Sequence, residues 1–166
     1  TYTLVSGVGD TDNASFAVVA SALNTTAVFD FETKSSYALR VRATDSAGLT
    51  FEKALTVTVT NVNEAPSDLA ASSTSVAENA ASSTTVGTLT SVDSDTGESF
   101  TYSLVAGAGD TDNASFAVAS ANLNTAAIFN FEVKASYAIR VRTTDAGGAA
   151  HEKALTITVT NVNEAP

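Results

Sequence analysis

The chain has 166 residues, a formal net charge of −10 and no cysteine, methionine or tryptophan. Its 8 Lys and Arg residues are too few to form the basic patch of a nucleic-acid-binding protein, and the lack of cysteine excludes a disulfide framework and thiolate metal sites. No apolar run approaches the ~18 residues of a membrane span and no secretory signal is evident, so we expect a segment of a longer protein. The acidic balance indicates either a solvated surface or carboxylates that converge on a hard cation.

An internal repeat organises the sequence. Residues 1–66 align with residues 101–166 without a gap, and about 46 of these 66 paired positions are identical. A period of about 100 residues is too long for a solenoid unit but suits a self-sufficient β-sandwich. We therefore predict a complete domain over 67–166 and a partial domain over 1–66 that lacks its first two strands. The exposed strand edges of the partial domain predict that upstream sequence or a neighbouring chain supplies those strands.

Alternation of apolar and polar residues predicts half-buried strands in both copies. Tyr37, Leu39 and Val41 alternate with Arg40 and Arg42, and the second copy repeats this pattern. Turns rich in Gly, Asp, Asn and Ser separate the strands, and we see no helical period of useful length. The sequence thus predicts an all-β chain of tandem immunoglobulin-like Greek-key β-sandwiches. The seven strands predicted for the complete domain lie near 74–78, 85–92, 100–105, 115–119, 123–131, 136–144 and 151–161.

Acidic and amide residues recur at the ends of these predicted strands. Calcium takes six to eight oxygen ligands from carboxylates and carbonyls, which is the chemistry that such a set offers. A single Asp-x-Asp is more often a turn than a ligand, so only the ordered set carries weight. In chain order the set comprises Asp30-Phe31-Glu32, Asp45, Asn61-Val62-Asn63-Glu64-Ala65-Pro66, Glu78, Asp93-Ser94-Asp95-Thr96-Gly97, Glu132 and Asp145.

The ordered set resembles the extracellular repeats of cadherins and their bacterial cadherin-like relatives. Glu78-Asn79 is similar to the family's first-strand glutamate, Asp93-x-Asp95-x-Gly97 to its Asp-x-Asp loop, and residues 61–66 to the acidic linker between repeats. The resemblance implies cadherin-like sandwiches with Ca²⁺ bound between consecutive repeats. Its implied ligands are Asp30, Glu32, Asn61, Asn63, Glu64, Asp93, Asp95 and Asp145 for the junction inside the chain, Glu78 and Glu132 for the following junction, and Asp45 for the preceding one.

Two departures from the family pattern and one further motif qualify this hypothesis. Asn61 and Asn130 stand where aspartate is usual, which lowers the ligand charge and predicts weak binding, with a dissociation constant of ~10⁻⁴–10⁻³ M. The repeated motif at 10–13 and 110–113 lies outside the family's junction motifs, and we interpret it as an exposed turn rather than an additional cation site.

The single histidine, His151, has no Cys or second His to act with, so we predict that the protein is not an enzyme.

The predicted function is that of a calcium-binding structural or adhesive repeat in a large extracellular, secreted or surface protein of bacterial type. It would act as a calcium-stiffened stalk or as a homophilic or heterophilic adhesion module. Its expected partners are neighbouring repeats of the same chain, with another protein or a cell-surface polysaccharide as further candidates. One alternative is a carbohydrate-binding accessory module, and a second is a fibre subunit that is completed by strands of a neighbouring chain.

Overall fold

The computed structural model describes residues 1–164, which divide into two compact units. Unit 1 spans Thr1–Val62 and unit 2 spans Asn63–Pro166. Both consist of β-strands joined by turns, with one short 3-10 helix each, in agreement with the all-β prediction. Within residues 1–164, no helix is long and apolar enough to cross a membrane. Ala165 and Pro166, the last two residues of the repeated linker motif, lie outside the described residues.

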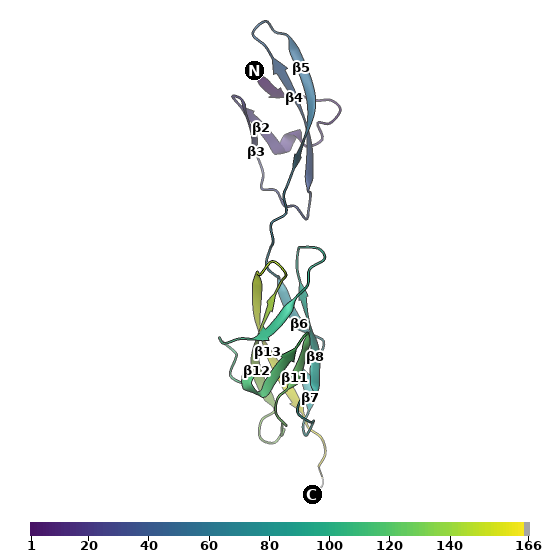
Figure 1. The fold of residues 1–166 in the computed structure, drawn as a ribbon, viewed down its shortest axis with the longest axis vertical. Helices are drawn as coiled ribbons and strands as arrows, with labels where there is room; N and C mark the ends of the chain where they lie inside the picture. Colours follow the sequence, from purple (N-terminus) through teal and green to yellow (C-terminus); the bar gives the residue numbers. More distant parts are fainter. Residues whose placement is uncertain (165–166) are drawn as a thin grey trace. The chain divides into compact units, whose positions relative to one another are not determined.

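Unit 2 is a sandwich of two four-stranded sheets (Figure 1). One sheet has the order β10-β11-β8-β6 and the other the order β7-β13-β12-β9. All neighbouring strands are antiparallel except β7, which runs parallel to β13. The elements are β6 (Asp68–Ala71), β7 (Ser75–Ala77), β8 (Thr85–Val92), β9 (Thr101–Leu104), η2 (Asn113–Ser115), β10 (Phe116–Ala119), β11 (Asn122–Thr125), β12 (Ser136–Thr144) and β13 (Ala150–Thr160).

Each predicted strand has a counterpart in unit 2, but two predictions need correction. Strand β6 was not predicted, because Asp68–Ala71 is a four-residue strand with two alanines and a weak alternation. The strand predicted over 123–131 ends at Thr125. Beyond it Phe129 enters the core, and the Asn130 side chain accepts a hydrogen bond from Val133 N, forming a turn instead of a ladder.

The core of unit 2 fills the space between its two sheets. Alternate residues of each strand point inward, so β-branched and leucine side chains from both sheets meet there. Leu69 on β6 and Leu123 on β11 are fully buried, as are Ile139 and Ile157 on the facing sheet. The core cluster consists of Leu69, Val76, Val86, Leu89, Phe116, Leu123, Phe129, Ile139, Val141, Ile157 and Val159.

Unit 1 repeats only the later part of this architecture. Its strands form a three-stranded sheet, β1-β4-β5, and a separate hairpin, β2-β3. Since β1 matches β9, unit 1 has no counterpart of β6, β7 or β8, which is three strands rather than the two predicted. Its buried hydrophobic side chains are Phe16 and Leu39. The elements are β1 (Tyr2–Leu4), η1 (Asn13–Ser15), β2 (Phe16–Val19), β3 (Ala22–Thr25), β4 (Ser36–Thr44) and β5 (Thr50–Thr58).

The motif at residues 10–13 contributes to folding and is not the exposed turn that we predicted. Asp12 is half-buried, forms an ion pair with Lys34, and accepts a hydrogen bond of 2.7 Å from Ala38 N on β4. The hydrogen bond from Lys34 lowers the pKa of Asp12 below its usual value. Asp112 repeats these contacts in unit 2. The loop therefore fixes the start of the long strand in each unit, and its carboxylates are already paired.

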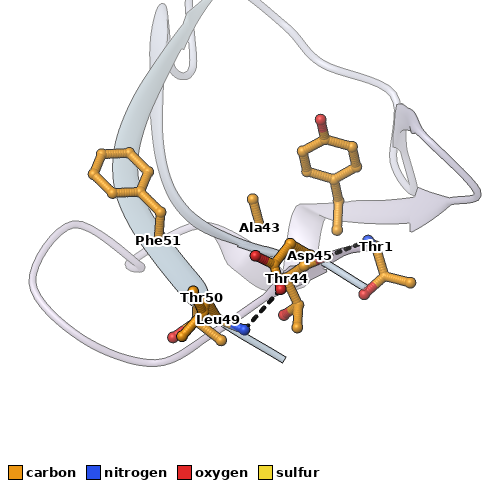
Figure 2. A pocket seen from close by; sticks show the side chains of 8 residues that line it. Thr1, Ala43, Thr44, Asp45, Leu49, Thr50 and Phe51 are labelled. Atoms are coloured by element: carbon orange, nitrogen blue, oxygen red, sulfur yellow. Dashed lines mark hydrogen bonds between the residues drawn. The ribbon is translucent and has the colours of Figure 1, made fainter. Parts of the chain in front are cut away.

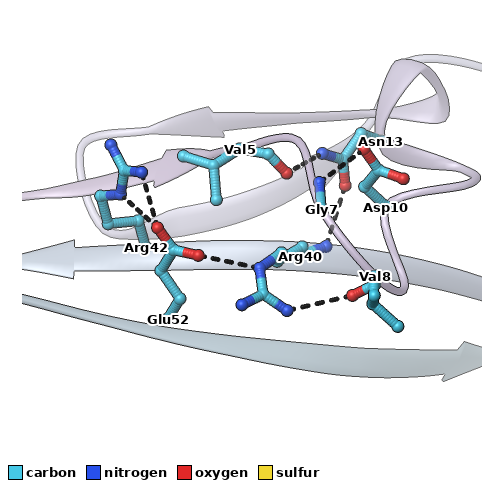
Figure 3. A network of polar contacts seen from close by, with 8 residues as sticks. All are labelled: Val5, Gly7, Val8, Asp10, Asn13, Arg40, Arg42 and Glu52. Carbon is cyan, nitrogen blue, oxygen red and sulfur yellow. Dashed lines mark hydrogen bonds and ion pairs between the residues drawn. The ribbon is translucent and has the colours of Figure 1, made fainter.

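A second polar network lies on β4 and β5 (Figure 3). Glu52 accepts hydrogen bonds from Arg40 Nε at 2.9 Å and from Arg42 Nη2 at 2.6 Å, one through each carboxylate oxygen. Asn13 links the preceding loop to the same strand, because its Oδ1 accepts from Arg40 N and its Nδ2 donates to Val5 O, both at 2.9 Å. The arginines predicted to face away from the core thus stabilise the outer face of the sheet.

The two units offer a matched test of burial. Leu123 is fully buried whereas Leu23, its counterpart in unit 1, is 40% exposed. We expect Leu123→Ala to lower the free energy of unfolding of unit 2 by about 2–5 kcal/mol, and Leu23→Ala to lower that of unit 1 by about 1 kcal/mol or less. Urea denaturation monitored by hydrogen exchange, which reports on the amides of each unit separately, measures both changes in the free energy of unfolding. Equal losses would contradict this account of the core.

Candidate functional site

Three carboxylates gather at one end of the unit 2 sandwich, beyond the ends of β8 and β12. The two strands belong to facing sheets, and a 2.8 Å hydrogen bond from Ser91 Oγ to Thr143 Oγ1 joins them one residue before each strand ends. Asp93 and Asp95 follow β8, and Asp145 follows β12. Asp95 and Asp145 retain only 8% and 6% of their exposure, although charged side chains are rarely buried without a partner.

The first residues of unit 2 lie against these carboxylates. Glu64 N donates a 3.0 Å hydrogen bond to Asp95 Oδ2, and Asn63 Nδ2 donates one of 3.0 Å to Asp145 Oδ2. Asp95 N in turn donates to Asp93 Oδ1 at 3.1 Å. These contacts unite five of the predicted ligands, and we call Asn63, Glu64, Asp93, Asp95 and Asp145 the linker cluster.

The linker cluster contains an unpaired buried oxygen. Asp93 Oδ2 is buried and has no hydrogen-bond partner, which within residues 1–164 is true of no other side-chain atom in a buried or half-buried residue. A buried acceptor left without a partner costs about 1–3 kcal/mol, and more when it is charged. Three carboxylates, one of which has an unpartnered oxygen, together with an amide form a donor set that suits a hard cation such as Ca²⁺.

A further acid at this end was not predicted. Glu98 Oε2 accepts a hydrogen bond of 3.2 Å from Ala146 N, which ties the loop after β8 to the loop after β12. The signal for it was in the sequence, since Glu98 follows the acidic loop at 93–97 directly. Its effect is to add negative charge beside Asp145.

Gly147 provides the space that Asn63 occupies. A Cβ built on Gly147 would lie 2.1 Å from Asn63 Oδ1 and 2.3 Å from Asn63 Cγ, well inside any tolerated contact. A side chain at 147 would therefore displace the Asn63 amide from its hydrogen bond to Asp145. Unit 1 has alanine at the matching position, Ala47. The sequence gave no reason to single out this glycine, because the clash arises only from the folded loop.

Glu78 and Glu132 lie at the opposite end of unit 2, where β7 and β13 end and β12 begins. Glu78 is 3% exposed, and its two carboxylate oxygens accept hydrogen bonds of 2.8 Å from Val162 N and Phe131 N. These backbone donors, Val162 first, lower the pKa of Glu78 below its usual value. Glu132 is exposed and accepts a hydrogen bond of 2.9 Å from Asn161 Nδ2.

Glu164 also lies at this end of unit 2. Its Oε1 accepts a hydrogen bond of 2.6 Å from Asn79 Nδ2. It is the repeat counterpart of Glu64, so its place could have been predicted from the repeated linker motif. The structure thus brings three acids to this end, and of these only Glu78 is described as accepting hydrogen bonds from backbone N–H groups, whereas Glu132 and Glu164 accept from asparagine side chains.

The predicted ligands in unit 1 are more exposed. Asp30, Glu32 and Asn61 are exposed, and Asp30 Oδ1 accepts a hydrogen bond of 2.9 Å from Thr33 N. That bond lowers the pKa of Asp30. Asn130 forms the same turn in unit 2, with Val133 N as donor at 3.0 Å. The exchange of aspartate for asparagine therefore preserves the local fold while it removes a charge.

Asp45 lies at the other end of unit 1, in a cavity of about 400 Å³ (Figure 2). Its Oδ1 accepts hydrogen bonds from Ala47 N at 2.9 Å and Leu49 N at 2.8 Å. Thr1 and Phe51 line the same cavity. Asp45 is exposed, in contrast to its buried counterpart Asp145. It is the only carboxylate among the residues that line this cavity.

A family model described as the cadherin domain matches residues 72–160. The chain belongs to the cadherin family. The matched region spans β7 to the end of β13 and so covers nearly all of unit 2. Cadherin domains are adhesion modules rather than enzymes, in line with the prediction that the chain has no catalytic role. The comparison with curated proteins gives no match.

Solved structures with this fold include several protocadherins. Human protocadherin-24 EC1-2 has a TM-score of 0.73 at 18% identity, covering 99% of this chain and 82% of that one. Human mucin-like protocadherin EC1-2 has a TM-score of 0.61 at 21% identity, with coverages of 98% and 84%. Protocadherin Gamma B2 extracellular cadherin domains 1-5 have a TM-score of 0.66 at 20% identity. The match covers 98% of this chain but only 32% of that one. These likenesses show the cadherin fold.

Substitution of Gly147 tests whether the linker cluster is seated as described. We expect Gly147→Ala to break the Asn63–Asp145 hydrogen bond, to lower the stability of unit 2 by about 1–2 kcal/mol, and to remove hydrogen-exchange protection from Glu64 N. The matched variant Ala47→Gly should leave unit 2 and Glu64 N unchanged. Protection of Glu64 N that survives Gly147→Ala would show that the linker does not depend on this space.

The Glu78 carboxylate predicts a dependence of stability on pH. Because its folded pKa lies below the unfolded value of about 4.3, its contribution is present above that value and is lost as the pH falls through the folded pKa. Glu78→Gln should therefore destabilise unit 2 by a constant amount between pH 5 and 8. The difference from wild type should shrink below about pH 4. Urea titrations at several pH values measure it, and a pH-independent difference would argue against this origin.

Proposed function

We propose that this chain is an extracellular structural or adhesive cadherin segment in which the linker cluster of unit 2 binds Ca²⁺. The observation that supports this most directly is Asp93 Oδ2, a buried carboxylate oxygen with no partner. Asp95 and Asp145 lie beside it and are nearly buried. A divalent cation would satisfy the orphaned oxygen and offset the charge of all three carboxylates at once.

Electrostatics supports the proposal that the cluster binds a cation. Two carboxylates 4 Å apart repel by about 4 kcal/mol at an effective dielectric constant of 20. Glu64 N and Asn63 Nδ2 reduce that repulsion by donating hydrogen bonds to Asp95 and Asp145. They supply only partial positive charge, however, and neither reaches Asp93 Oδ2. A bound calcium ion would supply two full positive charges at this end of the unit. The residues that would hold it are those of the linker cluster, Asn63, Glu64, Asp93, Asp95 and Asp145.

Other predicted ligands rest on the sequence resemblance. Glu78 and Glu132 are proposed for a second calcium site at the opposite end of unit 2, where Glu164 adds a third carboxylate. Glu78 has both oxygens engaged by backbone donors, so its role there would combine fold stability with coordination. Asp30, Glu32, Asn61 and Asp45 remain predictions from the resemblance alone.

The proposed role as a stalk or adhesion module follows from the position of the linker cluster at the end of unit 2. When the first residues of a unit belong to its cation site, ion binding fixes where the chain enters that unit. A bound ion would therefore stiffen the connection and protect it from proteases, as a stalk or adhesion module needs. Neighbouring repeats of the same chain are the proposed partners, and an extracellular setting supplies the calcium. A bacterial surface protein as the source stays a sequence-based hypothesis.

Calcium titration of the 166-residue chain tests the proposal. We expect a dissociation constant of ~10⁻⁴–10⁻³ M by calorimetry and at least about tenfold weaker binding in Asp95→Asn. At 10 mM calcium, mass action should stabilise unit 2 by about 1.4–2.7 kcal/mol. The control is Asp110→Asn, which removes one charge from a loop aspartate whose side chain accepts only from Gly107 N among the contacts described.

The outcomes separate site binding from a general charge effect. Retained affinity in Asp110→Asn together with loss in Asp95→Asn supports coordination by the linker cluster. Equal losses in both variants would show that net charge attracts the ion without a defined site. Absence of any calcium response in the wild-type chain would refute the proposal, while the cadherin fold would stand.

A further inference from the structure

A groove lies on the side of unit 2, where β9 of one sheet approaches the turn between β10 and β11 of the other. Its volume is about 430 Å³, within the range of about 300–1,000 Å³ that is usual for small-ligand sites. Both β9 and β10 are edge strands of their sheets. The residues that line the groove are Phe100, Thr101, Tyr102, Ser120 and Ala121.

Hydrogen bonds within unit 2 hold both walls of the groove in place. On the turn, the Ala121 carbonyl accepts a hydrogen bond of 2.7 Å from Leu89 N on β8. On β9, Tyr102 pairs with Thr143 of β12, and its hydroxyl accepts a hydrogen bond of 3.3 Å from Ser91 Oγ. A groove that is ordered beforehand loses less entropy when a ligand binds.

The groove is uncharged, although the chain has a net charge of −10. Residues 113–131, which include β10, β11 and the loop that follows, contain no charged side chain. Among the four strands of this sheet the single charged residue is Asp68 on the far edge strand β6, where it pairs with Lys153. A charged ligand would find no opposite charge in the groove to offset its desolvation, so the lining favours a neutral ligand.

The chemistry of the lining is aromatic on one wall and polar on the other. Phe100 and Tyr102 are half-buried side chains two positions apart on one strand direction. Ser120, opposite them, is exposed and carries a hydroxyl group. Beside the turn, Asn122 is also exposed, and its Oδ1 accepts from Thr88 Oγ1 at 3.3 Å, while no described contact uses its Nδ2. Hydroxyl and amide groups both donate and accept hydrogen bonds.

We propose that this groove binds a neutral polysaccharide built of hexopyranose rings. A pyranose ring is apolar on its faces and carries hydroxyl groups around its rim. One ring face would pack on Phe100 and Tyr102, and the rim hydroxyls would bond to the turn at Ser120 and to Asn122. The proposal does not rest on calcium binding, because none of the residues that line the groove belongs to the linker cluster.

A second copy of the chain fits this groove less well than a sugar does. A stable protein interface buries about 800 Å² on each partner, which far exceeds what a groove lined by five residues offers. Two chains that each carry a net charge of −10 also repel one another at low ionic strength. A neutral sugar is free of that repulsion and matches the size of the groove.

The test titrates the 166-residue chain with sugars while NMR follows the backbone amides of Ser120 and Ala121. The neutral probes are hexasaccharides of glucose and of mannose, and the acidic probe of equal length is a mannuronate hexasaccharide. We expect saturable shifts of both amides with a neutral probe and none with the acidic one. Phe100→Ala should weaken binding at least about tenfold, because the contact between ring and sugar is lost, whereas Phe100→Tyr should retain it.

Two further variants guard against a general effect on folding. Ala121→Glu leaves Phe100 in place but puts a charge into the groove, and it should also weaken binding at least about tenfold. The control is Phe51→Ala, which removes an aromatic ring that is 70% exposed in unit 1 and should leave binding unchanged. A chelator is present throughout, so that the result is separate from calcium binding.

Several outcomes would overturn the proposal. These are the absence of shifts with both neutral probes, equal binding of the acidic probe, binding that survives both Phe100→Ala and Ala121→Glu, and binding that is lost in Phe51→Ala. Amide shifts that depend on protein concentration and not on sugar, with a dimer in light scattering, would make a second copy the occupant and overturn it as well. Loss of binding in the two groove variants, with retention in Phe100→Tyr and Phe51→Ala, supports the proposal.

Discussion

The packing of two sheets against each other is the constraint from which the rest of unit 2 follows. Fully buried residues of β6, β8 and β11 meet those of β12 and β13, and this contact fixes how far each strand extends past the core. Since β8 and β12 end at the same edge of the sandwich, the residues that follow them must share one small region. Asp93, Asp95 and Asp145 are close together because the hydrophobic core holds the ends of their strands, despite the mutual repulsion of their charges.

The linker residues make that repulsion tolerable in the absence of an ion. Backbone and amide N–H groups donate to Asp95 and Asp145, and Pro66 is buried, so the entering chain is part of the unit rather than a free tether. This arrangement orders most of the proposed ligands beforehand, which would reduce the entropy lost when an ion binds. It leaves the buried Asp93 Oδ2 without a hydrogen-bond partner, so the negative charge on this oxygen is not compensated. If the cluster binds an ion as proposed, the hydrogen bonds already made to Asp95 and Asp145 would favour weak, reversible binding.

Much of the fold and part of the candidate site could be predicted from the sequence. Strong alternation with β-branched residues made β12 predictable to its last residue, and the repeat made its counterpart β4 equally clear. Strand β6 was missed because two of its four residues are alanine, which gives little alternation. The roles of Asp12 and Gly147 could not be predicted, since they depend on a backbone amide or a side chain many positions away in sequence. The alternation of apolar and polar residues predicts which face of a sheet a residue occupies. The contacts that a loop residue makes with residues distant in sequence are seen only in the folded structure.

The two copies show how far local sequence can be separated from stability. Residues 36–44 and 136–144 form the same strand with the same register to the next, although one lies over a complete core and the other over an open groove. Hydrogen-bonded ladders and the polar network of Arg40, Arg42 and Glu52 keep the strand pair of unit 1 in place. They do not remove its apolar side chains from water, and burial is the dominant favourable term in folding. The identical side chains therefore contribute less to the stability of unit 1, and the difference is set by what covers them.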